Sequence, residues 1–200
     1  MSRMPSGVGI LLGVCVAAVA AGPARADLVT FAPDPADLYD LPHQYYVTWG
    51  IQVDAEDPSL LLATAASLVF KNIYNWDDDE NVLYVRLLDT APLGVTTYWD
   101  AQGGGDNFQF QGIRLVTLRD LPDTPQTIVY EFEPDEVATL TDYLRNDGRI
   151  AIAFDPDCHF FNDGVSLDLA VASSVIPEPA SIALMAVGLA GMAFRLRRGR

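Results

Sequence analysis

The chain is poor in the side chains on which most enzyme sites depend. It contains two cysteines and two histidines, and its 12 basic residues are outnumbered by 27 acidic ones. Because the histidines are only His43 and His159, a Ser-His-Asp triad has few places to form. The sequence also lacks a P-loop, a dinucleotide fingerprint, a Gly-x-Ser-x-Gly turn and a His-Glu-x-x-His helix. We therefore predict a protein that is not an enzyme.

The shortage of basic residues is most pronounced between the two ends of the chain. Residues 27–176 contain six basic and 26 acidic residues, a net charge of −20. A charge of this sign opposes binding to nucleic acid or to anionic lipid. Cys158 is the single cysteine of this stretch, so it has no partner there for an intramolecular disulfide. It could pair with a cysteine of another chain or stay buried, and Phe160 and Phe161 nearby favour burial.

The first 26 residues are typical of a secretory signal peptide. Arg3 supplies a positive charge, residues 8–21 are apolar, and Ala24-Arg25-Ala26 fits an A-x-A cleavage site. Signal peptidase would cut between Ala26 and Asp27. We therefore predict a helical signal peptide at residues 1–26 and an exported mature chain that begins at Asp27.

The last 25 residues combine a short prolyl motif, an apolar span and a basic tail. Pro177-Glu178-Pro179 stays extended because proline cannot continue a helix interior. The span from Ala180 to Phe194 has no charge, and as a helix it would be roughly 22 Å long against a hydrocarbon core of about 30 Å. Four arginines hold the following end in the cytoplasm: Arg195, Arg197, Arg198 and Arg200. These features predict a transmembrane helix suited to transient anchoring in the inner membrane.

This tail, with its three parts in order at residues 176–200, resembles the PEP-CTERM sorting signal of Gram-negative bacteria. The resemblance implies that an exosortase recognises Pro177-Glu178-Pro179 and removes the tail. It also implies a link with extracellular polysaccharide. An ordinary tail anchor that is never cut is the alternative. Tails of this kind are also described as an ice-binding-protein C-terminal domain, but nothing in the sequence supports ice binding.

Residues 27–175 have the length of one domain and consist mainly of strand-like segments. Short stretches rich in aromatic and β-branched residues alternate with turns rich in Gly, Asp and Pro. The expected strands are residues 45–51, about 66–73, 82–88, 95–99, 108–118, 127–132, 149–154 and 165–172. Gly112 would lie inside one of them, at a bulge. The pattern predicts an antiparallel β-sandwich, jelly-roll-like, with one short helix.

The short helix is expected to begin at Pro134 and to end before Gly148. Proline suits the first helical turn, and glycine is a frequent C-cap. Apolar residues at helical spacing then lie on one face: Val137, Leu140, Tyr143 and Leu144.

One acidic loop is a candidate metal site. Residues 155–164 join the last two expected strands and hold three carboxylates and an amide: Asp155, Asp157, Asn162 and Asp163. Ca²⁺ takes six to eight oxygen ligands, and loops rich in Asp and Asn supply them. The spacing differs from that of an EF-hand, so a solvated loop with Asx-turns is the alternative. Ca²⁺ is the candidate ion, and no other cofactor is expected.

Several aromatic residues on the expected strands could stack against sugar rings. These are Tyr45, Tyr46, Trp49, Trp76 and Trp99, although core packing is the commoner fate of such residues.

We predict an exported, non-enzymatic protein of the cell surface or extracellular matrix that associates with exopolysaccharide. A secreted carbohydrate-active hydrolase is the alternative, because a glycosidase needs only two suitably placed carboxylates.

Overall fold

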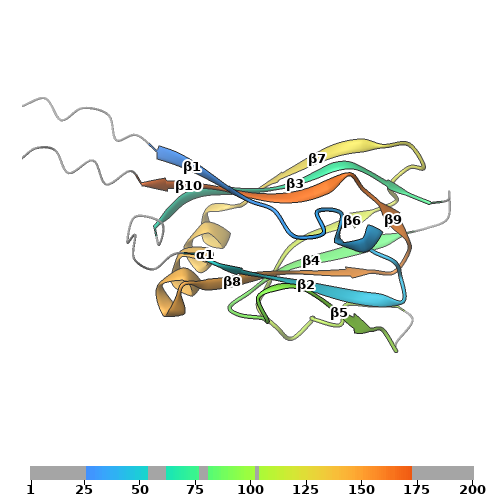
Figure 1. Cartoon of the computed structure of the whole chain (residues 1–200), viewed down its shortest axis with the longest axis horizontal. Helices are drawn as coiled ribbons and strands as arrows, with labels where there is room; N and C mark the ends of the chain where they lie inside the picture. Colours follow the sequence, from blue (N-terminus) through green and yellow to red (C-terminus); the bar gives the residue numbers. More distant parts are fainter. Residues whose placement is uncertain (1–25, 54–61, 77–80, 102–103, 173–200) are drawn as a thin grey trace, which may run out of the picture. The chain divides into compact units, whose positions relative to one another are not determined.

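The computed structural model describes residues 26–53, 62–76, 81–101 and 104–172. These residues fall within one compact unit. It is mainly β, as predicted, with two antiparallel sheets and, in the described ranges, one α-helix (Figure 1). A single turn of 3-10 helix, η1 (Leu38–Asp40), follows the first strand.

Each sheet contains five strands. Sheet A has the order β1 (Ala26–Phe31), β10 (Gly164–Ala172), β3 (Ala63–Asn75) and β7 (Gln126–Glu131), and the short β9 (Phe160–Phe161) also pairs with β3. Sheet B has the order β5 (Gly94–Trp99), β2 (Tyr45–Gln52), β8 (Arg149–Pro156), β4 (Val82–Leu88) and β6 (Ile113–Arg119). The chain therefore crosses between the sheets several times.

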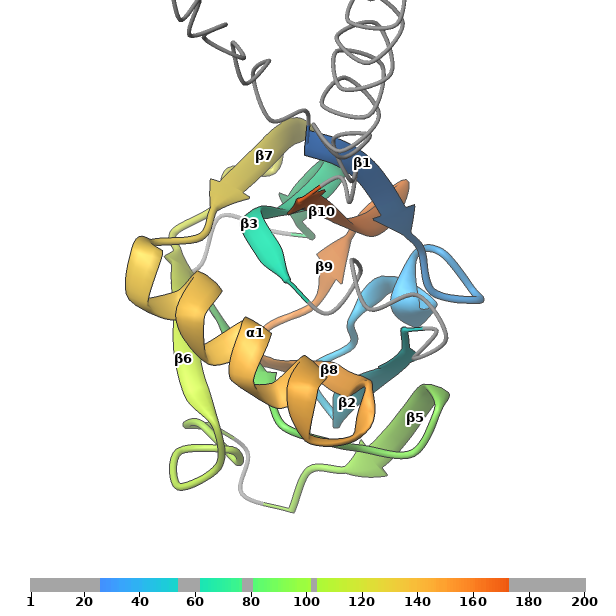
Figure 2. The ribbon, with the colours of Figure 1, turned by 90° about the vertical axis from the view of Figure 1, so that its left-hand side faces the viewer.

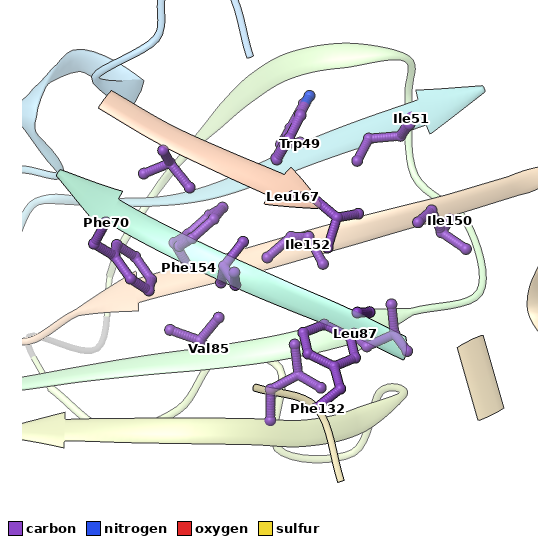
Figure 3. Close-up of a cluster of buried hydrophobic side chains, with 14 of the residues drawn as sticks. Trp49, Ile51, Phe70, Val85, Leu87, Phe132, Ile150, Ile152, Phe154 and Leu167 are labelled. Carbon is purple, nitrogen blue, oxygen red and sulfur yellow. The ribbon is translucent and has the colours of Figure 1, made fainter. Parts of the chain in front are cut away.

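The two sheets share one hydrophobic core because alternate residues of their strands point toward it. On β4 the predicted apolar face is confirmed, since Leu83, Val85 and Leu87 are fully buried. Figure 3 shows side chains of both sheets meeting in this core. Phe70 of sheet A and Phe154 of sheet B meet edge to face, with ring centroids 6.1 Å apart. Their burial excludes water from between the sheets.

The predicted helix is α1 (Pro134–Asp147), and both of its ends are as expected. Glu133 and Glu136 form a capping box at its start, and the N–H of Gly148 donates to the Leu144 carbonyl at its end. Leu140 and Leu144 are fully buried. Figure 2 shows α1 extending from the side of sheet A to that of sheet B. The helix contacts β3 and β8 and thus covers the core between the sheets.

Two strands differ from the sequence-based expectation. β1 was not expected, and it forms because residues 26–31 pair along their whole length with β10. β3 begins at Ala63 rather than near Ala66. Its first residues favour a helix by propensity, but their pairing with β10, including Ala66 opposite Leu169, holds them extended.

The strand expected at residues 108–118 begins only at Ile113, so the prediction for 108–112 was wrong. Gly112 stands before the strand, not inside it, and its φ of +53° breaks the extended backbone. A Cβ at this position would lie 2.0 Å from the Leu87 carbonyl oxygen. Only glycine therefore lets the backbone at residue 112 pass this close to β4. The irregularity in the β4–β6 pairing instead falls between Val85 and Arg86.

Candidate functional site

The aromatic residues singled out in the sequence are distributed over different parts of the fold. Trp49 is 4% exposed and belongs to the core, whereas Trp76 is 58% exposed at the end of β3. The remaining ones lie on β2 and its neighbour β5, the edge strand of sheet B. Tyr46 pairs with Tyr98, and one residue away Tyr45 pairs with Trp99. Neighbouring residues of a strand point to opposite faces. The Tyr46–Tyr98 pair therefore lies on the outer face of the β2–β5 ribbon, away from the core, and the Tyr45–Trp99 pair lies on the inner face, the face that carries the core residue Trp49.

The outer pair forms the wall of a hollow. The rings of Tyr46 and Tyr98 are stacked, with centroids 5.1 Å apart and planes 12° apart. Phe108 meets Tyr46 edge to face at 5.2 Å. The hollow measures about 270 Å³ and is lined by Tyr46, Thr48, Leu88, Thr90, Ala91, Pro92, Tyr98, Phe108 and Gln111. We call it the outer hollow.

No residue that lines the outer hollow is charged at neutral pH. In a chain with a net charge of −15, this lining is unusual. Polar side chains do occur there, namely those of Tyr46, Thr48, Thr90, Tyr98 and Gln111. Thr48 is 3% exposed, and its Oγ1 has no hydrogen-bond partner among the described residues. Aromatic faces beside uncharged hydrogen-bonding groups suit a neutral ligand with many hydroxyl groups.

A loop between β5 and β6 completes the outer hollow by supplying Phe108 and Gln111. The loop is held against sheet B by a buried ion pair, in which Arg86 Nε donates to Asp106 Oδ2 at 2.7 Å. Arg86 Nη1 also donates to the Gln111 carbonyl at 3.1 Å. Phe108, 4% exposed, packs with Leu88 in a small second core on the outer face of the sheet. The wall of the hollow is therefore fixed by polar and apolar contacts together.

Asp155 and Asp157 also bind the loop between β5 and β6, a contact that the sequence did not indicate. The carboxylate of Asp155 accepts hydrogen bonds from the backbone N–H and side-chain amide of Asn107. That of Asp157 accepts from the backbone N–H of Gly105 at 2.9 Å. Asp155 is completely buried, and this burial raises the pKa of its carboxyl group to about 6, with the negative charges of Asp100 and Asp157 acting in the same direction. Burial also raises the pKa of Asp157.

The four candidate calcium ligands divide into two groups. Asp155 and Asp157 face the loop at residues 105–107. Asn162 instead binds beside η1, where its Nδ2 donates to the Asp37 carbonyl at 2.8 Å, and Asp163 accepts from Asn72 Nδ2 at 2.6 Å. Within the described part of the chain, no group of three or more His, Cys, Asp and Glu residues could hold a metal ion. The structure thus keeps Asp155 with Asp157 and places the other two with different partners.

The segment between β8 and β10 is more ordered than a simple turn, since β9 lies inside it. Cys158 is a half-buried free thiol that packs against the core, so its expected burial is partial. His159 lies against Phe161, with ring centroids 4.6 Å apart, and burial lowers the pKa of its imidazole. Cys158 and His159 are neighbours in the chain, and their contacts are with aromatic and core residues.

Most residues assigned to processing lie outside the described ranges. These are Ala24, the motif Pro177-Glu178-Pro179 and the basic residues Arg195, Arg197, Arg198 and Arg200. Ala26 and Asp27 are described and open β1. None of the helices in the described ranges is long and apolar enough to span a membrane.

Comparison with known proteins defines the class of the chain through its tail. The family model described as the PEP-CTERM protein-sorting motif matches residues 175–198. The chain therefore carries a PEP-CTERM sorting motif, as the sequence indicated, and is an exported protein that an exosortase sorts. No curated protein matches the chain.

Some solved structures show a distant likeness to the chain. Two structures of latent aurone synthase, a polyphenol oxidase, align with TM-scores of 0.40 and 0.41, each at 10% identity. They cover 68% and 67% of this chain, which in turn spans 26% of the length of each of those chains. A likeness this weak says nothing about the activity of the chain.

Proposed function

We propose that the protein is a non-enzymatic component of the cell surface or extracellular matrix that binds neutral polysaccharide in the outer hollow. The observation that carries the proposal is the stacked pair of Tyr46 and Tyr98 within an uncharged lining. A sugar ring has an apolar face that packs on such aromatic rings, and hydroxyl groups that bind the surrounding polar side chains.

The ligand should be neutral rather than acidic. A uronate or sulfated polysaccharide needs basic partners, and the outer hollow offers none. The acidic body would repel such a polymer as a whole. The same charges keep an exported protein soluble in a matrix.

We further propose that the fold is a β-sandwich of the jelly-roll type. The strand orders β1-β10-β3-β7 and β2-β8-β4-β6 support this topology, with β5 added beyond β2. In this interpretation β5 and the loop after it are an insertion between β4 and β6. Tyr98, Phe108 and Gln111 all come from that insertion, and binding residues are commonly carried by such additions to a rigid scaffold.

The alternative of a hydrolase needs carboxylates that a substrate can reach. Asp155 has the raised pKa of a general acid, but its side chain is completely buried beneath the loop. It is therefore better placed to hold the loop than to protonate a sugar. Release of reducing sugar from any polysaccharide that the protein binds would favour the hydrolase and contradict our proposal.

Binding to a panel of soluble polysaccharides tests the proposal. Mature protein would be run through gels that contain dextran, pullulan or galactomannan as neutral polymers, and alginate as an acidic one. We expect retardation by at least one neutral polymer and none by alginate. Tyr98→Ala should weaken binding at least about tenfold, because it removes an aromatic face worth roughly 1.5–3 kcal/mol. Trp76→Ala is the matched control, an exposed aromatic outside the hollow.

Retardation by alginate alone, or no effect of Tyr98→Ala, would contradict the proposed site. Thermal unfolding of each variant must remain close to that of the unaltered protein, so that loss of binding reports on the site. A Gln111→Ala variant adds an independent check, because Gln111 is exposed and its removal leaves both stacked rings in place.

A further inference from the structure

The inner side of the β2–β5 ribbon carries a second hollow, of about 340 Å³, which we call the inner hollow. It is lined by Tyr39, Pro42, Tyr45, Val95 and Thr97. Trp99 stands beside it, edge to face with Tyr45, with ring centroids 5.6 Å apart and planes 82° apart. Tyr39 and Trp99 are 58% and 66% exposed. Two large aromatic rings are thus held open to solvent around a concave surface.

The position of Tyr39 depends on an unfavourable backbone conformation. Four successive residues, Leu38 to Leu41, have φ between +41° and +59°, a region that L-residues rarely occupy. The buried side chains of Leu38 and Leu41 compensate for this conformation, as does the hydrogen bond from Asn162 to the Asp37 carbonyl. Tyr39 between them points outward. Strained backbone that the surroundings maintain is frequent at ligand sites.

The inner hollow has the same chemical character as the outer one. Its lining has no residue charged at neutral pH. The hydroxyl groups of Tyr39, Tyr45 and Thr97 have no hydrogen-bond partner within the described part of the chain, and they surround aromatic and apolar carbon. β5 contributes to both hollows, because its alternate residues face opposite ways. It is the edge strand of sheet B (Figure 1), so it pairs with β2 on one side only.

We propose that the inner hollow is a second site for a neutral sugar, so that one protein molecule binds two polysaccharide chains and cross-links them. This inference rests on the proposed function of the outer hollow. The two sites face away from each other across one ribbon, so two rigid sugar rings that occupy them need not belong to the same chain. Bivalent binding of this kind converts a binding protein into a structural component of a matrix.

Stoichiometry and cross-linking can be measured separately. A short oligosaccharide, cut from the neutral polysaccharide of the panel that binds, would be titrated into the mature protein by calorimetry. We expect two molecules bound per protein, one in Trp99→Ala and one in Tyr98→Ala. Trp99 is exposed, so its replacement should leave the fold intact. Trp76→Ala is again the control and should keep both sites.

Light scattering of the intact neutral polymer then reports on cross-linking. The unaltered protein should raise the apparent particle size severalfold. Trp99→Ala and Tyr98→Ala should each bind the polymer more weakly, through the one remaining hollow, and leave its size unchanged. One oligosaccharide per protein, unaffected by Trp99→Ala, would overturn the second site while the proposed function stands. One oligosaccharide whose binding both substitutions weaken would mean a single chain that spans both faces, and would also overturn cross-linking. Failure of the unaltered protein to bind any polymer would instead reject the proposed function itself.

Discussion

Ala26, the first residue of β1, is paired with Ala172, the last residue of β10. The predicted signal-peptide junction and the linker to the sorting motif thus leave the fold from neighbouring strands at the same end of sheet A. Cleavage after Ala26 would remove only the first residue of β1, and the pairing from Asp27 opposite Val171 onward would remain. Only a few residues separate Ala172 from Pro177, so an exosortase must act close to the folded sheet.

Both terminal segments should be absent from the mature protein. The reasons are the cleavage site before Asp27 and the sorting motif at residues 175–198. Intact-mass spectrometry of protein isolated from its native envelope or medium would show a mass that lacks residues 1–26 and the apolar tail. A majority of molecules with the tail attached would favour a permanent anchor over exosortase processing.

The stability of the domain should fall as the pH rises from about 4 to about 6. The pKa of Asp155 is raised to about 6 in the folded state from an ordinary value of 3.8, so in this range the folded state binds a proton that the unfolded state has lost. The shift corresponds to about 3 kcal/mol of unfolding free energy, present below pH 4 and lost above pH 6. Asp157, whose pKa is also raised, acts in the same direction.

Asp155→Asn should remove most of this pH dependence, because the amide does not ionise. Urea unfolding at pH 4.5 and pH 7.5 measures it, with Asp123→Asn, a change at an exposed residue, as the control. If unaltered protein and Asp155→Asn lose the same stability between the two pH values, Asp155 is not the responsible group.

The calcium hypothesis predicts that Ca²⁺ raises the melting temperature. Binding to the folded state alone contributes about 2.7 kcal/mol at a hundredfold excess over Kd, or very roughly 5 °C for a domain of this size. Asp157 and Asp163 have separate partners. If the ion lies near Asp155, Asp157→Asn should abolish the rise in melting temperature, whereas Asp163→Asn should retain it. Mg²⁺ should have a smaller effect because it demands tighter octahedral geometry. Equal melting with Ca²⁺ and with a chelator would reject calcium binding.

Gly112→Ala should be among the most destabilising small substitutions in the chain. The new Cβ would meet the Leu87 carbonyl oxygen at 2.0 Å, in addition to the cost of a φ of +53°. We expect a loss of about 2–5 kcal/mol in urea unfolding. Gly94→Ala is the matched control: its φ is +78°, but a Cβ there would meet nothing within 4 Å, so the loss should be only about 1–2 kcal/mol. Equal losses in the two variants would show that the contact with Leu87 is unimportant.

Some features were set by local sequence and could be predicted from it. Alternation along residues 82–88 identified the buried face of β4, because a strand has a period of two. Pro134 and Gly148 marked the ends of α1, because each suits one backbone conformation. The sorting motif is a short contiguous stretch of sequence, so it could be recognised without any fold.

Other features depended on contacts between segments that are distant in the chain. β1 exists because β10 offers it a partner, and Asp155 is buried because a loop some fifty residues earlier folds over it. The sequence could place Tyr45, Tyr46 and Trp99 on strands, but it could not tell that β5 forms an edge, that Tyr98 stacks on Tyr46, or that Tyr39 is held outward. Local sequence determines periodicity and caps, whereas burial, pKa and the two aromatic hollows are decided by which strands become neighbours in the tertiary structure.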